Sequence, residues 1–423
     1  MRILILSKEA WRNEQNGGNV LSNMFEGFDA EFAQIFCSEG EPNNNICRLY
    51  YQMTDRMMVD NILKRKKVGK ILNYTNYPSN TKNVIKDYNT VRKLNLDSIR
   101  ILREITWFIA KWDVNEIIHF AKEFSPDIIF APCYGNHYML RLSRLIAKEF
   151  NVPFVSYISD DFYSNKQFKF SPIYWVNHFI LRKHIRETFR LYDLVYTMTD
   201  EQKEQCEQNF GVTMKILRKC GHFDKKYEKK SVNNPIRFVF AGGIYLNRWK
   251  TLMALADAMR KINKHKVKMV LDIYTGTEIP SNIKKRLDDG ITTKMHKPVS
   301  MEKLFEIYRN SDVALHVESF DLKNRLLVRR SFSTKIVDCL DSGCAVMALC
   351  DNKQAGYSYL KKNDAAITLA DLHSLEKVLQ SILNNNDILI EYQRKAFALG
   401  RKNHLKENND IMIKHDFYNL CNM

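Results

Sequence analysis

Short apolar runs alternate with longer helix-like segments along most of this chain, and this alternation constrains its fold more than any other feature. Each run has the length of a buried strand and is followed by polar or glycine residues. Strands that alternate with helices predict a parallel, doubly wound α/β sheet, because parallel neighbours need a crossover between them. In the first half of the chain the runs are residues 3–6, 32–36, 127–131, 152–158 and 193–198.

A second set of runs comes after a polar segment. Residues 228–235 combine charged side chains, asparagines and a proline, which is typical of a domain boundary. Residues 236–241 then predict a new first strand, which ends in Gly242 and Gly243. With 423 residues, the chain is long enough for two or three domains. We expect two α/β domains and a C-terminal helix, over residues 1–228, 236–395 and 396–423.

The charge of the chain restricts its partners. A formal net charge of +17 favours a partner or substrate of opposite sign, such as nucleic acid, an anionic membrane or a nucleotide sugar. The sequence has no RNP-type aromatic motif, zinc finger or glycine-rich arginine tract, so we expect no nucleic-acid partner. It also has no GxxxxGK[ST], GxSxG or HExxH motif, which argues against P-loop ATPases, serine hydrolases and zinc proteases.

The cysteines and the first residues indicate the compartment. Nine cysteines are scattered without a CxxC pair, so neither a zinc site nor a disulfide framework is indicated. The start, MRILILSKEAW, resembles a first strand more than a signal peptide. No apolar run approaches the roughly 20 residues that cross a bilayer. We therefore expect a reduced, cytoplasmic protein with no metal site and no transmembrane helix.

Residues 312–340 join a strand-end acid to the start of a helix. The apolar run 312–317 predicts a buried strand that carries Glu318 at its carboxyl end, the edge where open α/β sheets bind ligands. Ser333 or Thr334 is the expected N-cap of the next helix. A phosphate could sit at that helix start with Lys335 nearby. The alternative is that these residues only cap the helix and that Glu318 is a solvated strand end.

The segments HVESF (316–320) and SFSTKIVDCLDSGCAVMA (331–348) resemble the retaining glycosyltransferases of the GT-B fold, which include many bacterial capsule and lipopolysaccharide enzymes. The resemblance implies two Rossmann-like domains that face a central cleft, with the C-terminal helix packing back toward the first domain. It implies a metal-independent hexosyltransferase that moves a sugar from a nucleotide-diphosphate donor to a glycan or lipid-linked acceptor, with retention, in surface-polysaccharide assembly. No cofactor is implied beyond the donor substrate.

The resemblance also implies roles for residues near this strand end. Glu318 would orient the donor sugar, and the helix start at Ser333, Thr334 and Lys335 would hold the diphosphate. The family places two glutamates a short, fixed distance apart, one at the donor sugar and one at the ribose. Here the second acid is Asp338, and an arginine-rich loop expands its spacing from Glu318. The ribose is therefore assigned either to Asp338 or to another residue.

Gly242 and Gly243, with Arg248 and Lys250 after them, resemble the family's glycine turn and basic pair that grip the donor diphosphate. Fixed cations there would stabilise the negative charge that builds on the departing diphosphate. Either Arg248 or Lys250 could match the family's lysine. The alternative is that both belong to a solvated basic patch. His296 lies in the segment MHKPV (295–299), before a helix expected from about Ser300. In relatives the loop at this position borders the nucleotide base; an exposed loop histidine is the alternative.

In the first half, Gly17 and Gly18 resemble the family's glycine-rich loop, which faces the donor phosphates and the acceptor. An ordinary strand-to-helix loop is the alternative. Asp160 and Asp161 end the run 152–158, where paired carboxylates can orient sugar hydroxyls or act as a general base. We assign the acceptor-side role to Asp161, with a turn cap as the alternative.

Residues 55–70 join apolar positions to the basic run 64–67, the composition of a helix that lies on an anionic membrane. We expect this segment to contact the inner face of the cell membrane, which would suit a lipid-linked acceptor. The alternative is core packing with a solvated basic surface, and we favour that interpretation for the helix that contains Trp107 and Trp112.

Two other functions share this architecture, because a fold does not fix a reaction. A nucleotide-sugar epimerase of the same fold would convert the donor without any acceptor. A non-catalytic GT-B subunit of a polysaccharide assembly complex would dock on partners without turning over a donor.

Overall fold

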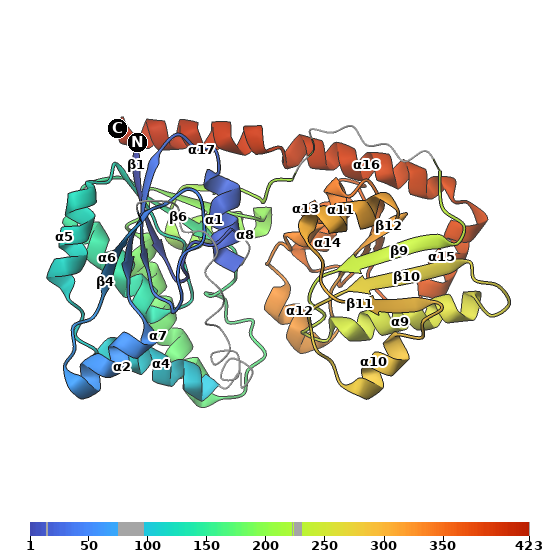
Figure 1. Cartoon of the computed structure of the whole chain (residues 1–423), viewed down its shortest axis with the longest axis horizontal. Coiled ribbons are helices and arrows are strands. Elements are labelled where there is room, and N and C mark those ends of the chain that lie inside the picture. Colours follow the sequence, from blue (N-terminus) through green and yellow to red (C-terminus); the bar gives the residue numbers. More distant parts are fainter. Residues whose placement is uncertain (14–15, 75–96, 222, 224–230, 423) are drawn as a thin grey trace. The chain divides into compact units, whose positions relative to one another are not determined.

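The computed structural model describes residues 1–13, 16–74, 97–221, 223 and 231–422. The chain divides into two compact units, each with its own sheet (Figure 1). Unit 1 consists of Met1–Asn165, Lys169–Leu217 and Asn409–Met423. Unit 2 consists of Lys166–Phe168 and Arg218–Asn408.

The eight-stranded sheet of unit 1 has the order β4-β3-β2-β1-β5-β6-β7-β8. All neighbours are parallel except β3 and β4, which form an antiparallel pair at one edge. The strands are β1 (Arg2–Ser7), β2 (Glu31–Phe36), β3 (Leu49–Gln52), β4 (Lys70–Asn73), β5 (Ile128–Phe130), β6 (Phe154–Ile158), β7 (Leu194–Thr197) and β8 (Met214–Ile216).

The helices of unit 1 begin at polar caps that the sequence supplies. The side chains of Thr54, Asp113, Ser171 and Thr199 each accept a hydrogen bond from the backbone N–H three residues on. The helices are α1 (Asn16–Phe25), α2 (Asp55–Lys64), α4 (Asp97–Ile109), α5 (Val114–Phe124), α6 (His137–Glu149), α7 (Pro172–Phe189), α8 (Asp200–Phe210) and most of α17 (Lys406–Cys421).

Both faces of the unit 1 sheet are covered. Residues that alternate along a strand point to opposite faces, so Ile129 joins the core formed with helices α5 to α8, while Phe130 packs on the other side. There the rings of Phe130 and Phe25 of α1 pack edge to face, with their centres 5.2 Å apart. The Phe25 ring also packs against Phe417 of α17, with the ring centres 6.4 Å apart. Asp416 of α17 accepts a hydrogen bond from the Tyr196 hydroxyl at 2.8 Å. The last helix is therefore part of the unit 1 core.

The six-stranded sheet of unit 2 is fully parallel and has the order β11-β10-β9-β12-β13-β14. Buried, continuous apolar strands such as β12 and β13 are typical of a sheet covered on both faces. The strands are β9 (Ile236–Ala241), β10 (Met269–Tyr274), β11 (Thr293–His296), β12 (Val313–Val317), β13 (Ala345–Leu349) and β14 (Ile367–Leu369).

Figure 1 shows α9 and α10 on one side of this sheet and α13 and α16 on the other. Apolar side chains of α9, α10 and α15 share one core with the strands. The helices of unit 2 are α9 (Arg248–Ile262), α10 (Ser281–Leu287), α11 (Met301–Arg309), α12 (Leu322–Val328), α13 (Lys335–Asp341), α14 (Ala355–Lys362), α15 (Leu375–Asn384) and α16 (Asp387–Asn403).

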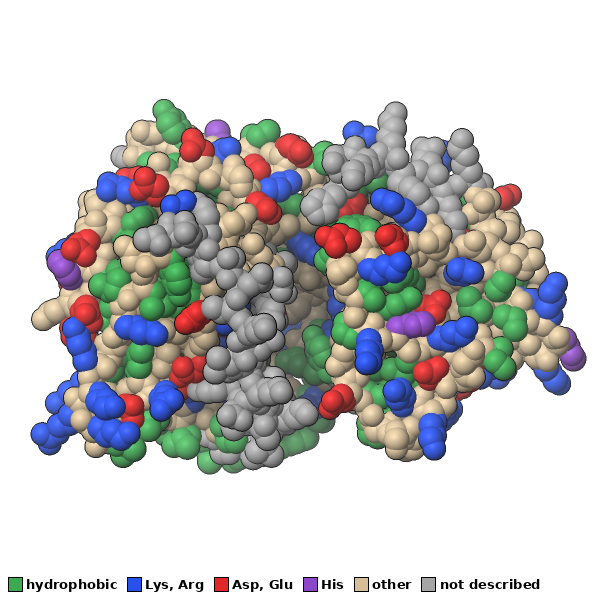
Figure 2. All heavy atoms as spheres, in the orientation of Figure 1, with side chains coloured by type: hydrophobic (Ala, Val, Ile, Leu, Met, Phe, Trp, Pro, Cys, Tyr) green, Lys and Arg blue, Asp and Glu red, His purple; other side chains and the backbone are tan. Residues whose placement is uncertain are grey.

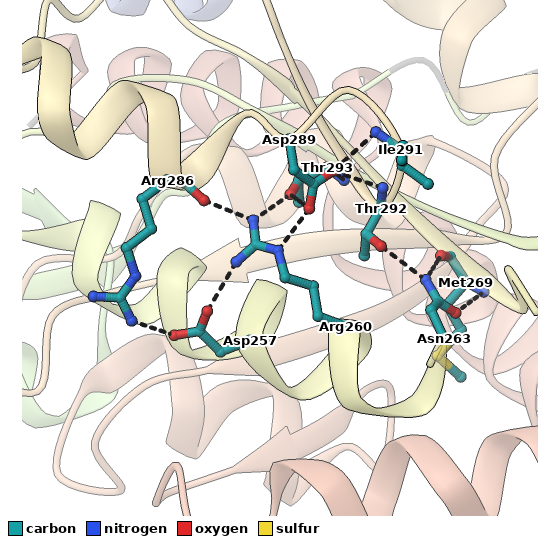
Figure 3. A network of polar contacts seen from close by, with 9 residues as sticks. All are labelled: Asp257, Arg260, Asn263, Met269, Arg286, Asp289, Ile291, Thr292 and Thr293. Atoms are coloured by element: carbon teal, nitrogen blue, oxygen red, sulfur yellow. Dashed lines mark hydrogen bonds and ion pairs between the residues drawn. The ribbon is translucent and has the colours of Figure 1, made fainter. Parts of the chain in front are cut away.

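A polar network fixes the far end of α9 to the turn before β11 (Figure 3). Arg260 donates to Asp289 at 2.6 Å, and Asp289 also accepts the backbone N–H groups of residues 291–293. Partial burial opposes ionisation, but these donors, led by the Thr293 N–H, hold the pKa of Asp289 at about 2. Asp257 joins Arg260 to Arg286 of α10. The helix that begins at the candidate site is thus anchored at its other end.

The predicted fold class is confirmed, because the chain forms two Rossmann-like domains whose sheets are parallel apart from the β3–β4 pair at one edge. Residues 396–423 are not one helix but contain the end of α16 and all of α17. Within the described residues, no helix combines the length and the apolar character that crossing a membrane requires.

Candidate functional site

Two neighbouring strands of unit 2 end at the same edge of the sheet. β9 and β12 pair in parallel, with Val313 opposite Phe238. Gly242 comes directly after β9, and Glu318 comes directly after β12. The carboxyl ends of these strands therefore bring the glycine turn and the glutamate, far apart in sequence, to the edge where α/β sheets bind ligands.

Arg248, the first residue of α9, binds the Glu318 carboxylate at two points. Its Nε donates to Oε2 at 2.8 Å and its Nη2 to Oε1 at 2.9 Å. Arg248 is only 8% exposed and Glu318 only 6%. Burial by itself lowers the pKa of Arg248, but the hydrogen bonds and charge of Glu318 outweigh it and raise that pKa. The two predicted site residues thus form one buried, neutral pair.

Backbone and side-chain contacts hold this pair in place. The Thr251 hydroxyl donates to the Glu318 carbonyl at 2.8 Å, and the Glu318 N–H donates to the Leu349 carbonyl at 3.0 Å. The Arg248 guanidinium also lies over the Tyr245 ring, 5.0 Å from its centre. Glu318 is therefore fixed by both its side chain and its backbone.

The turn between β9 and α9 is strained and is held by side chains at the start of α12, which follows β12. Leu246 and Asn247 both have left-handed backbones, with φ of 56° and 61°. The Asn324 amide donates to the Leu246 carbonyl at 2.8 Å, and the Asn247 amide donates to the Asp321 carboxylate at 2.5 Å. These contacts offset the strain and fix the start of α9.

Lys335 lies against Gly242. A Cβ on Gly242 would overlap the Lys335 ammonium, and Gly242 has a φ of 146° that favours glycine. The ammonium also lies 5.4 Å from the centre of the Phe240 ring. Burial, with a smaller effect from the nearby charge of Arg248, lowers the pKa of Lys335 to about 8, against the opposing effect of Glu318. Among the described residues, no carboxylate lies within ion-pair distance of this ammonium.

The other predicted residues near Lys335 lie at the start of one helix. Helix α13 begins at Lys335, and Thr334 occupies the N-cap position without a side-chain capping bond. Ser333 contributes its carbonyl, which accepts the Ile336 N–H at 3.0 Å. The Asp338 carboxylate accepts a hydrogen bond from Lys219 at 2.6 Å. The prediction that Ser333 or Thr334 is the N-cap is confirmed for Thr334, although its backbone is already helical and its side chain makes no capping bond.

Lys250 and His296 each have a carboxylate partner. Lys250 is exposed, and its ammonium lies 3.2 Å from the Asp321 carboxylate. His296 ends β11, bonds Asp272 at 2.6 Å and stacks on Tyr274 with the ring centres 4.5 Å apart. The proposed contacts of Lys250 with a diphosphate and of His296 with a base stay predictions.

The predicted residues of unit 1 are placed in separate local structures. Gly17 and Gly18 fall inside the first turn of α1, so they are part of a helix. The Asp161 carboxylate accepts the Ser164 N–H at 2.9 Å, which is the turn-capping contact of the alternative interpretation. Of residues 55–70, the first ten form α2.

Sequence reasoning missed four residues that support the site: Tyr245, Thr251, Asp321 and Lys219. Asp321 and Thr251 had a weak signal, since each lies three residues from a predicted site residue, Glu318 or Arg248. Lys219 had none, because it lies more than a hundred positions from Asp338 in sequence, with |i−j| of 119. Contacts across such distances depend on the sheet topology and not on local pattern.

This arrangement is suited to binding an anion. The Arg248–Glu318 pair is neutral, whereas Lys335 carries a charge that no described carboxylate compensates by direct contact. Because Gly242 has no Cβ, the ammonium can lie directly against its backbone at the ligand-binding edge of the sheet. A phosphate at this edge could gain a charge-assisted hydrogen bond from the ammonium.

Comparisons with known proteins give a fold and no family. No family model matches the chain, and no curated protein matches it. Solved structures do. The sucrose-phosphate synthase of Thermosynechococcus elongatus superposes with a TM-score of 0.62 at 11% identity, covering 99% of this chain and 98% of that one. The structure of the Anabaena protein HepE in complex with UDP superposes with a TM-score of 0.63 at 13% identity. The match covers 99% of this chain and 100% of the HepE chain.

A third similar structure, described as trehalose-6-phosphate from E. coli bound with UDP-2-fluoro glucose, gives a TM-score of 0.62 at 12% identity and covers 100% of this chain and 99% of its own. The match extends over whole chains in all three cases, so it includes both domains. The chain has the GT-B fold of glycosyltransferases.

Proposed function

We propose that the protein is a glycosyltransferase that moves a sugar from a nucleotide-diphosphate donor to a glycan or lipid-linked acceptor. The observation that carries this proposal is the Lys335 ammonium against Gly242, beside the buried Arg248–Glu318 pair and without direct contact to a carboxylate of the described residues. Two structures of the same fold are described with UDP or a UDP-sugar bound, which supports a nucleotide sugar as the ligand.

The proposed chemistry needs a cation where the leaving group departs. Breaking the bond between the anomeric carbon and the diphosphate leaves the bond electrons, and therefore negative charge, on the phosphate oxygen. In this proposal the Lys335 ammonium, which lies against Gly242 at the carboxyl end of β9, stabilises that charge without a metal. Glu318, fixed by Arg248 and Thr251, orients the hydroxyls of the donor sugar.

Retention and a role in surface-polysaccharide assembly are the finer parts of the proposal. One structure of this fold, with a TM-score of 0.60 at 11% identity, is described in terms of glycosyl transfer with retention by trehalose-6-phosphate synthase. The sequence segments around Glu318 and Lys335 resemble the surface-polysaccharide branch. A lipid-linked acceptor would place the enzyme at the inner face of the cell membrane, with residues 55–70 in contact with it.

A binding panel tests the proposal. We would titrate the full chain with UDP, GDP, ADP and CMP and with their common sugar conjugates, using the shift in thermal unfolding. We expect stabilisation by one diphosphate family, and loss of that stabilisation in Lys335→Ala. Stabilisation by none of the nucleotides would contradict the donor site and favour a non-catalytic subunit.

A second assay separates transfer from epimerisation. The conjugate that binds is incubated without acceptor, and then with a panel of glycan and lipid-linked acceptors. An epimerase converts the donor sugar in the first incubation, whereas we expect product only with an acceptor. The anomeric configuration of that product decides between retention and inversion.

A further inference from the structure

The helix α4 in unit 1 exposes an apolar face. Leu102, Ile105, Phe108 and Ile109 lie on one side of it at helical spacing, and all four side chains are exposed. Phe108 is 79% exposed and Leu102 is 63%. Scattered apolar residues are normal on a protein surface, but a contiguous apolar helix face marks an interaction site.

The opposite face of α4 holds the helix in this orientation. Trp107 is buried, stacks on Tyr138 with ring centres 4.2 Å apart, and donates from its Nε1 to the Asp55 carboxylate at 2.6 Å. Arg103 donates to the same carboxylate at 2.7 Å. Burying the apolar face inside unit 1 would break these contacts, so α4 presents that face outward as a fixed feature.

The neighbouring helix α2 extends the apolar surface and adds positive charge. Asp55, which binds α4, is the first residue of α2, and Asn61 of α2 accepts the Lys111 N–H just after α4. The α2 side chain Leu63 is 73% exposed. The exposed basic side chains beside this surface are Lys64, Arg65, Lys66, Lys67 and Lys111. Lys64 and Lys66 lie within ion-pair distance of Asp60, and Lys67 of Asp113 and Glu116, so five positive charges stand against three negative ones. Figure 2 shows Lys and Arg side chains gathered at the end of unit 1 where Figure 1 places α2.

We propose that the outer face of α4 and the adjoining end of α2 form a docking surface for an anionic membrane leaflet. Leu102, Phe108 and Leu63 enter the interface between headgroups and acyl chains, and the basic side chains bind the anionic headgroups. The inference rests on the membrane location within the proposed function. It names α4, and not only the basic segment, as the part that enters the lipid.

Charge complementarity selects this occupant over a second copy of the chain. A partner copy would bring the same positive charges, and the whole chain carries a formal net charge of +17. Like charges around an apolar contact oppose self-association. An anionic leaflet instead attracts each basic residue near its surface by about 1 kcal/mol.

The test is sedimentation of the full chain with vesicles of phosphatidylcholine, or of phosphatidylcholine mixed with phosphatidylglycerol, in the absence of donor. We expect the protein to pellet with the anionic vesicles only. Phe108→Ser combined with Ile109→Ser should lower the partition coefficient by about tenfold or more, because it removes apolar side chains that would be buried in lipid. Lys64→Gln with Lys66→Gln should lower it by about tenfold at low salt and by less at high salt.

Matched controls use equally exposed residues elsewhere. Ile291 in unit 2 and Ile411 on α17 are 66% and 67% exposed, and their double serine variant should bind vesicles like the unmodified protein. Lys361→Gln with Lys362→Gln on α14 is the control for charge. Vesicle binding equal in the α4 variant and the control would overturn the proposal. So would failure of the unmodified protein to pellet, or a dimer in solution that the α4 variant abolishes.

Nucleotide binding is measured on the same variants without vesicles. If the donor site exists, the α4 and α2 variants retain it, because they lie in unit 1 and the donor residues lie in unit 2. Loss of vesicle binding with nucleotide binding intact supports the docking surface. Absence of nucleotide binding in the unmodified protein would contradict the proposed function. The docking surface would then still be supported or overturned by the vesicle measurements alone.

Discussion

Arg248 holds the Glu318 carboxylate by two hydrogen bonds, of 2.8 and 2.9 Å, in a place where both side chains are almost fully buried. Each charge is removed from water, and each compensates the other. Such a pair adds little to stability compared with apolar residues of the same size, but the loss of one partner leaves a buried charge without compensation. The pair therefore couples the stability of unit 2 to the residue that we assign to the donor sugar.

Replacing Glu318 by alanine should both destabilise and inactivate the protein. The free energy of unfolding should fall by about 3–5 kcal/mol, because Arg248 stays buried without its partner. Turnover should fall by about two orders of magnitude or more if Glu318 stabilises the transition state. Urea denaturation and a donor-turnover assay measure the two effects.

The double variant Glu318→Leu with Arg248→Met separates the effect on stability from the effect on turnover. It should recover most of the lost stability, since no buried charge remains, while turnover stays low. The control is Glu306→Ala, which breaks the exposed pair with Lys303 on α11 and should change stability by less than about 1 kcal/mol. Full activity in the double variant would remove Glu318 and Arg248 from the site.

The affinity for a nucleoside diphosphate should depend on the protonation of Lys335. Its pKa in the unliganded protein is about 8, so its ammonium is mostly charged at neutral pH. Affinity should be nearly constant between about pH 7 and 8, where the terminal phosphate is already ionised, and fall as the pH rises above 8, because the neutral amine no longer attracts phosphate. Calorimetric titrations of the nucleotide that binds, at a series of pH values, measure this.

Lys335→Ala should lower the affinity by about tenfold or more, the size of a charge-assisted hydrogen bond, and should flatten the pH profile around 8. Lys361→Ala, at an exposed position on α14, is the matched control and should keep the unmodified profile. If the affinity of Lys335→Ala still fell above pH 8, the pH dependence would have to come from another group.

The close approach of Lys335 to Gly242 predicts a specific effect of adding one methyl group. Gly242→Ala should weaken nucleotide binding and lower stability by about 1–3 kcal/mol, because the Cβ meets the lysine and the backbone is left-handed. Gly290→Ala is the control: its φ is 73°, and a Cβ there meets nothing within 4 Å. It should cost about 1 kcal/mol and leave nucleotide binding unchanged. Equal binding losses in both variants would point to a general loss of folding.

Local pattern was enough to predict the strands that end at the candidate site and the residues at their carboxyl ends, but it missed the short strands β3, β4, β8 and β14. The runs before Gly242 and Glu318 are buried strands, and both residues lie at a ligand-binding edge of the sheet because parallel strands end together. The period of apolar residues also placed the helix start at Lys335. These features depend on residues close in sequence, so the sequence shows them directly.

Pairing across the sheet was not predictable in this way. The bond between Arg248 and Glu318 joins residues with |i−j| of 70, and only the β9–β12 neighbourhood brings them together. For the same reason the sequence left open which of Arg248 and Lys250 belongs to the site. Arg248 is buried and Lys250 is exposed, and this depends on where α9 begins. Gly17 and Gly18 lie in a helix because a glycine pair does not by itself specify a loop.

Buried His404 should make stability depend on pH in a defined window. Its Nδ1–H donates to the Lys219 carbonyl at 2.9 Å, and its Nε2 accepts from the Tyr359 hydroxyl at 2.9 Å, so the folded protein holds the neutral ring. Burial lowers the pKa of His404 to about 4, against an ordinary value of 6.5. The unfolded chain therefore binds a proton between these values that the folded protein does not.

The free energy of unfolding should consequently be highest above pH 6.5 and fall as the pH drops toward 4, by up to about 3 kcal/mol from this residue. Urea denaturation at a series of pH values measures the slope. His404→Gln lowers stability at all pH values through lost contacts, but it should also reduce the slope in this window, which a purely structural role would not. His265→Gln, at an exposed position after α9, should leave the slope unchanged. An unchanged slope in His404→Gln would mean that the folded protein takes up the proton at His404 as readily as the unfolded chain does.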